Sequence, residues 1–233
     1  MFISVCYDRH MIRLFHRFLE FLFPRRCLGC KKSGTFLCRA CLEAIPTHKT
    51  QHCPVCLRES LLGKICETCS GWTLDGLFVV APYSQKSLLQ TCIKTMKYGA
   101  AHSLCRILGA WMANHWTPID LSDDILIVPV PLYPLREKSR GYNQAELLAR
   151  QVGQPQHLIR RIRNTVPQAQ LSRKDRLENL KNSFDISSKR DLLNKKIILV
   201  DDVCSTGATL NECARVLRAA GARKIWGLVL ARG

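Results

Sequence analysis

Apolar and polar residues alternate in two rhythms after residue 71, one typical of strands and the other typical of helices. Short apolar runs predict strands at 75–83, 125–131, 196–200 and 224–231. Between them, apolar residues recur at helical spacing and predict helices at 86–97, 103–116, 143–151, 173–180 and 207–220. Strands that alternate with helices indicate an α/β fold, in which a parallel sheet is flanked by helices. Ligands of such sheets bind beyond the carboxyl ends of the strands.

Two of these helices begin with a capping-box pattern. Asn143 precedes Glu146 by three positions, and Ser172 precedes Asp175 in the same way. In a capping box the first side chain accepts from a backbone N–H group of the first turn, and the acidic side chain bonds back to the first residue. The sequence therefore predicts reciprocal caps at both helix starts.

The first 23 residues follow the helical rhythm but carry charges throughout. Apolar side chains recur at helical spacing at Leu14, Phe15, Phe18, Leu19 and Leu22. Arg9, Arg13 and Arg17 interrupt the run, so it lacks both a secretory core of about 7–15 apolar residues and a membrane span of about 20. We expect an amphipathic helix at 1–23 that packs on the protein, with docking on a membrane surface as the alternative. We therefore expect no transmembrane segment and a cytoplasmic location.

Cysteines punctuate the stretch between this helix and the α/β pattern. Eight of the 13 cysteines form four C-x-x-C pairs: Cys27/Cys30, Cys38/Cys41, Cys53/Cys56 and Cys66/Cys69. Two such turns can surround one zinc ion with four thiolates, and Gly34 and Gly63 suit the bends between turns. We expect two structural zinc sites in a double zinc ribbon at 24–70, followed by the α/β domain at 71–233. The pairing is open between consecutive and cross-braced, and a redox dithiol is the weaker alternative.

The charge balance points to a polyanionic partner. The chain holds 35 Lys and Arg against 18 Asp and Glu, a formal net charge of +17. Nucleic acid or a phosphorylated metabolite suits such a surface, and a merely solvated basic surface is the alternative.

Two adjacent acids and a small-residue loop stand at the end of the strand predicted at 196–200. Asp201 and Asp202 follow the strand, and a turn leads from there into the next helix. That turn consists of Ser205, Thr206, Gly207, Ala208 and Thr209. Backbone N–H groups at such a turn cradle a phosphate. The carboxylates can accept hydrogen bonds from ribose hydroxyls or hold Mg²⁺ through water. The alternative is a capped turn without a ligand.

Several stretches together resemble a known family. The segment 198-ILVDDVCSTGATL-210 closely resembles the phosphoribosyl diphosphate (PRPP) motif of type I phosphoribosyltransferases. With 127-IVPVPLYPLREKSRGYNQAELLA-149, 167-PQAQLSRKDRLENLKNSF-184 and the cysteine pairs, the chain resembles the ComF family of competence proteins over roughly residues 24–232. Members are also described as predicted amidophosphoribosyltransferases. The resemblance implies a type I phosphoribosyltransferase fold behind the double zinc ribbon.

The resemblance also implies roles for individual residues. Asp201 and Asp202 would bind ribose hydroxyls and Mg²⁺ with PRPP, and residues 205–209 would hold the 5′-phosphate. The loop that receives the diphosphate would contain Arg136, Lys138, Arg140, Gly141, Asn143 and Gln144. A flap at 160–176 would bring Arg163, Gln168, Arg173 and Arg176 to a phosphate, a base or DNA.

Two functions follow from the resemblance. In the first, the protein binds PRPP and handles imported single-stranded DNA during natural transformation, with competence or recombination proteins as partners. In the second, it is a phosphoribosyltransferase of nucleotide metabolism that uses PRPP, Mg²⁺ and a nitrogen acceptor that no motif identifies. Residues 136–181 hold eleven Lys and Arg against four acids, a surplus that favours the first. Aromatic residues that could stack on bases are few: Trp72, Tyr83, Tyr98, Tyr133 and Tyr142.

Overall fold

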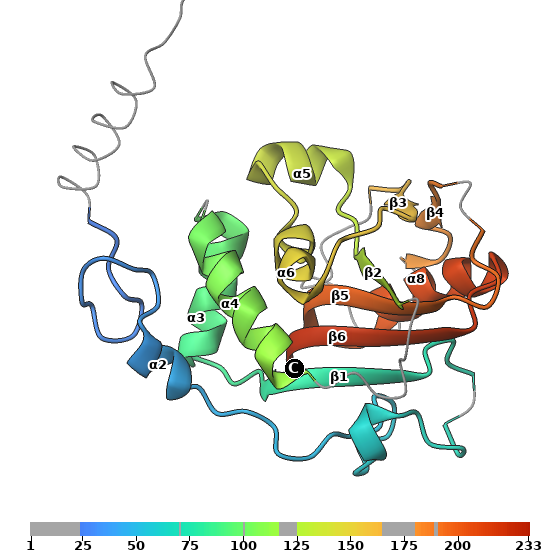
Figure 1. Ribbon diagram of the computed structural model, residues 1–233, viewed down its shortest axis with the longest axis horizontal. Coiled ribbons are helices and arrows are strands. Elements are labelled where there is room, and N and C mark those ends of the chain that lie inside the picture. Colours follow the sequence, from blue (N-terminus) through green and yellow to red (C-terminus); the bar gives the residue numbers. More distant parts are fainter. Residues whose placement is uncertain (1–23, 70, 100, 117–124, 165–179, 189–190) are drawn as a thin grey trace, which may run out of the picture. The chain divides into compact units, whose positions relative to one another are not determined.

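The computed structural model describes residues 24–69, 71–99, 101–116, 125–164, 180–188 and 191–233 (Figure 1). The chain forms two compact units, residues 1–44 and residues 45–233. The helix predicted at 1–23 lies outside the described residues, as do Ser172 and Asp175 and the predicted helix at 173–180 up to its last residue.

A four-stranded parallel sheet forms the centre of the second unit. Its strands are β1 (Gly76–Pro82), β2 (Ile125–Pro129), β5 (Lys196–Cys204) and β6 (Lys224–Arg232). Their order is β1-β6-β5-β2, and each neighbouring pair is parallel. The central strands β5 and β6 are buried along most of their length, as their continuous apolar runs predict. The predicted α/β fold class is therefore confirmed.

Helices lie on both faces of this sheet (Figure 1). Between β1 and β2 the chain forms α3 (Leu88–Tyr98) and α4 (His102–His115), and α6 (Gln144–Val152) packs against α4. Helix α8 (Ala208–Ala219) connects β5 to β6. The connection from β1 to β2 and the connection from β5 to β6 cross the sheet in opposite directions. Since both connections are right-handed by rule, α8 lies on the face opposite α3 and α4.

Smaller elements complete the described part of the chain. Helix α5 (Pro134–Arg140) precedes α6 and ends at Gly141, which adopts a left-handed φ of 84°. Strands β3 (Ile159–Arg161) and β4 (Phe184–Ile186) form an antiparallel pair. The cysteine-rich segments contain α2 (Arg39–Glu43) and the short 3₁₀ helix η1 (Leu61–Gly63).

Helix α6 corrects one prediction about its start. The Asn143 side chain accepts from the backbone N–H of Ala145 at 3.0 Å, as a capping residue should. The Glu146 carboxylate, however, accepts from Arg150 at 3.0 Å and lies 3.5 Å from His157 Nε2. The reciprocal capping box predicted for Asn143 and Glu146 is therefore wrong, because the carboxylate contacts Arg150 and His157 instead of the backbone.

Candidate functional site

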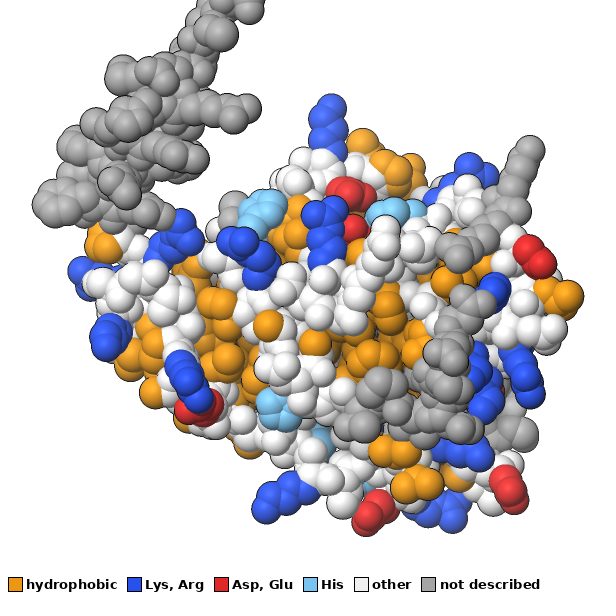
Figure 2. Space-filling view, in the orientation of Figure 1, with side chains coloured by type: hydrophobic (Ala, Val, Ile, Leu, Met, Phe, Trp, Pro, Cys, Tyr) orange, Lys and Arg blue, Asp and Glu red, His pale blue; other side chains and the backbone are white. Residues whose placement is uncertain are grey.

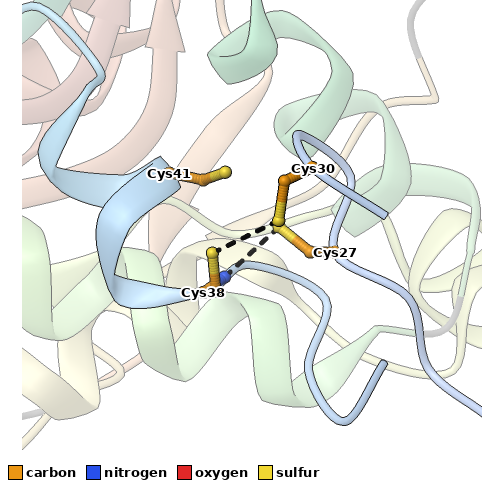
Figure 3. Close-up of side chains that lie close together, drawn as sticks. All are labelled: Cys27, Cys30, Cys38 and Cys41. Carbon is orange, nitrogen blue, oxygen red and sulfur yellow. Dashed lines mark hydrogen bonds between the residues drawn. The ribbon is translucent and has the colours of Figure 1, made fainter. Parts of the chain in front are cut away.

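The eight cysteines of the C-x-x-C pairs gather into two groups of four. Cys27, Cys30, Cys38 and Cys41 form the first group, in the first unit (Figure 3), and Cys53, Cys56, Cys66 and Cys69 form the second group, in the second unit. Within each group the sulfur atoms lie within 4.8 Å of one another. The pairing is therefore consecutive, which decides between the two arrangements that the spacing allows.

The sulfur spacing fits a tetrahedral zinc ion. Four sulfurs at a Zn–S distance of ~2.3 Å lie about 3.8 Å apart. The Cys30 and Cys38 sulfurs are 3.7 Å apart, and the Cys56 and Cys66 sulfurs are 3.6 Å apart. Four thiolates fill the tetrahedron and leave no position for a substrate, so each group fits a structural metal site.

Each first C-x-x-C turn is built by the same backbone pattern. The N–H of Cys27 donates to Lys32 O, and the N–H of Cys53 donates to Arg58 O, both at 2.8 Å. The residue after each turn, Lys31 or Leu57, adopts a left-handed φ of 65°. This positive φ reverses the chain and turns the backbone N–H groups toward the sulfurs.

These N–H groups favour the thiolate form that binds metal. A hydrogen bond from the backbone N–H of Arg58 is the main cause that lowers the pKa of Cys56 to about 6. Burial raises the pKa of Cys27, but hydrogen bonds from the N–H groups of Cys38, Cys30 and Gly29 outweigh it and lower the value to about 6. Such hydrogen bonds favour the thiolate, the form of cysteine that binds zinc.

The second cysteine group is attached to the sheet within its unit. The N–H of Ile65 donates to Asp75 O at 3.0 Å, and Lys64 forms an antiparallel bridge with Gly76 at the start of β1. The Gln51 side chain bonds to both backbone groups of Val79, at 2.9 and 3.0 Å. The division at 70/71 predicted from motifs therefore differs from the division by packing, which falls between Ala44 and Ile45.

Asp201 and Asp202 lie within strand β5, close to its carboxyl end. Successive residues of a strand point to opposite faces, so the two carboxylates are not equivalent. Asp202 is buried at 3% exposure, and its Oδ2 lies 3.0 Å from the Nζ of Lys97, the penultimate residue of α3. Asp201 Oδ1 accepts from the N–H of Asp202 at 2.8 Å. Asp202 thus has Lys97 as its counter-ion, whereas Asp201 is held by a hydrogen bond from the backbone.

Cations from separate elements lie near this pair. Attraction to Asp202 and to Asp201 opposes the desolvation of Lys97, so the pKa of Lys97 is raised above its ordinary value. Arg161 of β3 is buried, with its guanidinium 5.4 Å from the Phe184 ring centre. Burial is the main cause that lowers the pKa of Arg161, and repulsion from Arg136 adds to it, whereas attraction to Asp201 opposes it.

Sequence reasoning missed both Lys97 and Arg161. Lys97 follows Lys94 near the end of a helix, and Arg161 is one of two arginines in a three-residue strand. Neither belongs to a motif, because the partner of each lies far away in the chain.

The small-residue loop continues directly from the acids into α8. Gly207 has a left-handed φ of 78° and caps the helix, which begins at Ala208. The Thr206 hydroxyl accepts from the N–H of Ala208 at 3.4 Å. The first N–H groups of a helix have no partner within the helix, so the start of α8 can hold a phosphate beside the carboxylates.

The predicted diphosphate loop comprises α5 and the start of α6. Arg140 donates to the Gln144 side chain, and its guanidinium lies 5.9 Å from the Tyr98 ring centre. Asn143 Nδ2 donates to Val130 O at 3.0 Å, which ties this loop to the end of β2. The positive charge of Arg136 repels Arg161, and that of Arg140 repels Lys97. The Lys138 side chain is exposed.

The predicted flap lies mostly outside the described residues. Of its four named residues only Arg163 is described; it is exposed and donates to Lys181 O at 3.0 Å. Gln168, Arg173 and Arg176 fall within 165–179. Their roles stay a prediction.

The raised pKa of Asp201 gives the stability of the protein a testable pH dependence. Desolvation, followed by repulsion from Asp202, raises the pKa of Asp201 to about 7. An acid whose pKa rises on folding costs stability as the pH rises from its unfolded value of about 3.9 through the folded value. We expect Asp201→Asn to stabilise the protein above pH 7 and to have little effect at pH 4, as measured by urea unfolding at both values.

Asp185→Asn is the matched control for that experiment. Arg160 donates to Asp185 at 2.8 Å and lowers the pKa of this exposed carboxyl. Stability from this pair is present at neutral pH and is lost as the pH falls, so the control should have the opposite sign and a small size. Equal behaviour of the two variants at pH 4 and above pH 7 would contradict the prediction.

Comparisons with known proteins follow the two parts of the chain. The phosphoribosyl transferase domain model matches residues 130–233, and the double zinc ribbon domain model matches residues 18–70. Competence protein F of Haemophilus influenzae is 31% identical over 238 residues, which cover 90% of this chain and 98% of that protein. The DNA utilization protein YhgH of Escherichia coli is 31% identical over 211 residues, which cover 82% of this chain and 89% of that protein.

One solved structure is similar to part of the chain. The glutamine phosphoribosylpyrophosphate amidotransferase from B. subtilis is 20% identical, with a TM-score of 0.36, over 55% of this chain and 26% of that chain. Within the residues that the structure describes, no helix has both the length and the apolar character needed to cross a membrane.

Proposed function

Because the chain belongs to the ComF family of competence proteins, we propose that it binds PRPP or a related phosphoribosyl ligand and handles imported single-stranded DNA in the cytosol. The observation that carries the ligand proposal is the sequence of groups at the end of β5. Two carboxylates, Asp201 and Asp202, lead into the phosphate cradle at 205–209. Lys97 and Arg161 lie near the acids, and Arg140 lies near Lys97.

This arrangement matches the chemistry of a phosphoribosyl ligand. Such a ligand has a phosphate at one end, vicinal hydroxyls in the middle and, in PRPP, a diphosphate at the other end. The cradle suits the phosphate, and carboxylate oxygens accept hydrogen bonds from hydroxyls. Arg136 and Arg140 of helix α5 suit the diphosphate. Hence one site can hold all parts of the ligand.

The acids also fit Mg²⁺, although unequally. Carboxylate oxygens are ligands that Mg²⁺ prefers. Asp202 Oδ2 is buried and already has the Lys97 ammonium at 3.0 Å, so Asp201 is the better candidate to hold the ion through water. When bound, Mg²⁺ would neutralise charge on the diphosphate. Lys97 and Arg161 would supply positive charge beside the acids from the chain itself.

Titration calorimetry with PRPP and Mg²⁺ tests the ligand half of the proposal. The zinc-loaded native chain should bind saturably, and Asp201→Asn should bind at least about tenfold more weakly, since it removes a charged acceptor. Asp185→Asn, which removes an exposed carboxylate paired with Arg160, should bind as the native chain does. Absence of binding by the folded native chain would refute a phosphoribosyl site. Turnover of PRPP with a nitrogen acceptor would instead favour the transferase of nucleotide metabolism.

The DNA half of the proposal rests on positive charge and one exposed aromatic ring. Lys and Arg side chains are spread over the face in Figure 2, and few acidic side chains lie among them. Tyr98 is 83% exposed, close to the Arg140 guanidinium, whereas Tyr142 is buried at 7%. An exposed ring beside a cation is a suitable stacking position for a base of a single strand. Of these two tyrosines, Tyr98 fits this role, and Tyr142 is a packing residue.

Tyr98→Ala should weaken the binding of single-stranded oligonucleotides about tenfold, because one stacked base contributes ~1–3 kcal/mol. The slope of log affinity against log salt should stay the same, since no cation is removed. Arg140→Ala should instead reduce that slope by about one. Tyr98→Phe keeps the ring and is the matched control. Fluorescence anisotropy at several salt concentrations measures both quantities, and equal affinity of Tyr98→Ala and Tyr98→Phe would exclude stacking.

A further inference from the structure

The indole ring of Trp72 lies directly against the phosphate cradle. A Cβ atom built on Gly207 would lie 2.3 Å from Cη2 and 2.6 Å from Cζ3 of Trp72, so the ring occupies the space beside the glycine. Gly207 is also the residue whose left-handed φ turns the chain into α8. The ring therefore contacts the backbone that sets the direction of the cradle's N–H groups.

The residues after Trp72 hold the same helix at two further points. The N–H of Thr73 donates to the Asn211 side chain at 2.7 Å, in the first turn of α8. Arg218, in the last turn, donates to Thr73 O at 3.0 Å and to Asp75 Oδ2 at 2.7 Å. Contacts at the beginning and the end of α8 fix the helix relative to residues 72–75.

Residues 72–75 are in turn held by the second cysteine group. Cys69 provides one thiolate of that group and precedes Trp72 by three positions. Directly before Cys66, another member of the group, the N–H of Ile65 donates to Asp75 O at 3.0 Å. The group and the hydrogen bond thus fix both ends of the segment that carries the indole ring.

We propose that Trp72 is a positioning residue for the phosphate cradle, and that the second metal site supports the cradle through it. The inference rests on the proposed phosphoribosyl site and adds a residue and a metal site that act on it from outside. Backbone N–H groups bind an anion strongly when they already point at it before the ligand arrives. With the ring against Gly207, the turn cannot relax toward the space that the ring fills. The second zinc ribbon is then part of the ligand site.

Replacement of the ring tests this role. In the zinc-loaded chain, Trp72→Ala should bind ribose 5-phosphate at least about tenfold more weakly by titration calorimetry, and amides 205–209 should exchange hydrogen faster. Trp72→Phe retains a ring and should recover most of the affinity. Trp72→Leu fills part of the volume and serves where the alanine variant does not fold.

Trp226 is a matched control, because it makes the same kind of contact elsewhere. Its ring lies against Gly76 at the start of β1, where a Cβ would lie 2.4 Å from Cζ3. Trp226→Ala should lower the melting temperature without changing affinity or exchange at 205–209. Native affinity and exchange in folded Trp72→Ala or Trp72→Leu would overturn the inference. If the native chain does not bind ribose 5-phosphate or PRPP, the proposed function fails, and the exchange comparison still decides the role of Trp72.

Discussion

Replacing Cys53 and Cys66 together with serine should unfold much of the second unit, whereas replacing Cys27 and Cys38 should leave that unit folded. The two double variants remove equivalent ligands from the two cysteine groups. The group with Cys53 and Cys66 belongs to the unit of residues 45–233, and the group with Cys27 and Cys38 belongs to the unit of residues 1–44. Structural zinc in isolated zinc fingers contributes ~10–16 kcal/mol to folding. Even a fraction of this exceeds much of the ~5–15 kcal/mol that stabilises a typical domain.

The reason for the asymmetry is the attachment of the second group to the sheet. Arg232, at the end of β6, donates to Pro54 O inside the first turn of that group. Gln51, two residues before Cys53, bonds to Val79 of β1. Loss of the metal would release both contacts together with the residues around them.

Circular dichroism and zinc content provide the measurement. Each double variant should lose one of two zinc ions, and only Cys53→Ser/Cys66→Ser should lose the near-ultraviolet signal and the main cooperative transition. Equal losses in the two variants would show that the attachment to the sheet contributes little.

Asp202→Ala should destabilise the protein by about 3 kcal/mol, because it leaves the Lys97 ammonium without its nearest carboxylate. The pair is mostly buried, with 4% exposure for the acid side chain and 27% for the lysine side chain. Breaking one side of a buried ion pair costs more than the pair contributes, since the remaining charge stays desolvated. Asp201→Asn should instead stabilise the protein at neutral pH. The two adjacent acids should therefore change the free energy of unfolding in opposite directions.

A double-mutant cycle isolates this contact. Lys97→Met should also destabilise the protein, but Lys97→Met with Asp202→Ala should cost clearly less than the sum of the two. Urea unfolding of the four proteins at pH 7 gives the coupling free energy. Additive effects would mean that the 3.0 Å contact does not stabilise the fold. The result also guides ligand studies, since a variant at Asp202 would combine a folding defect with any loss of binding.

The parts of the fold that depend on local sequence could be predicted. Strands β5 and β6 are apolar runs in the sequence, and the structure extends β5 from the predicted 196–200 to Lys196–Cys204. The extension places Asp201 and Asp202 inside the strand, because β6 continues to pair with them as far as Arg232. The four C-x-x-C turns were also recognisable, since each is built from a few adjacent residues.

Features that depend on contacts between distant segments could not be predicted. Consecutive pairing of the cysteines, the ion pair of Lys97 with Asp202 and the contact of Trp72 with Gly207 each join separate parts of the chain. Helix α5 was missed for a different reason: it is a seven-residue helix in a charged loop, without an apolar face that signals a helix. The local sequence pattern therefore located the acids and the cradle, but not Lys97 and Trp72, which contact them.

The attachment of residues 48–51 to β1 has a consequence for how the chain can be divided. Strand β1 is at one end of the sheet order, and such an edge strand offers free backbone groups to other molecules. The N–H of His48 donates to Val80 O at 2.9 Å, and Gln51 bonds to Val79, so this segment covers the edge. A fragment that starts at residue 71 would expose the edge and tend to aggregate through it. A fragment that starts at Ile45 would keep its own protection against self-association.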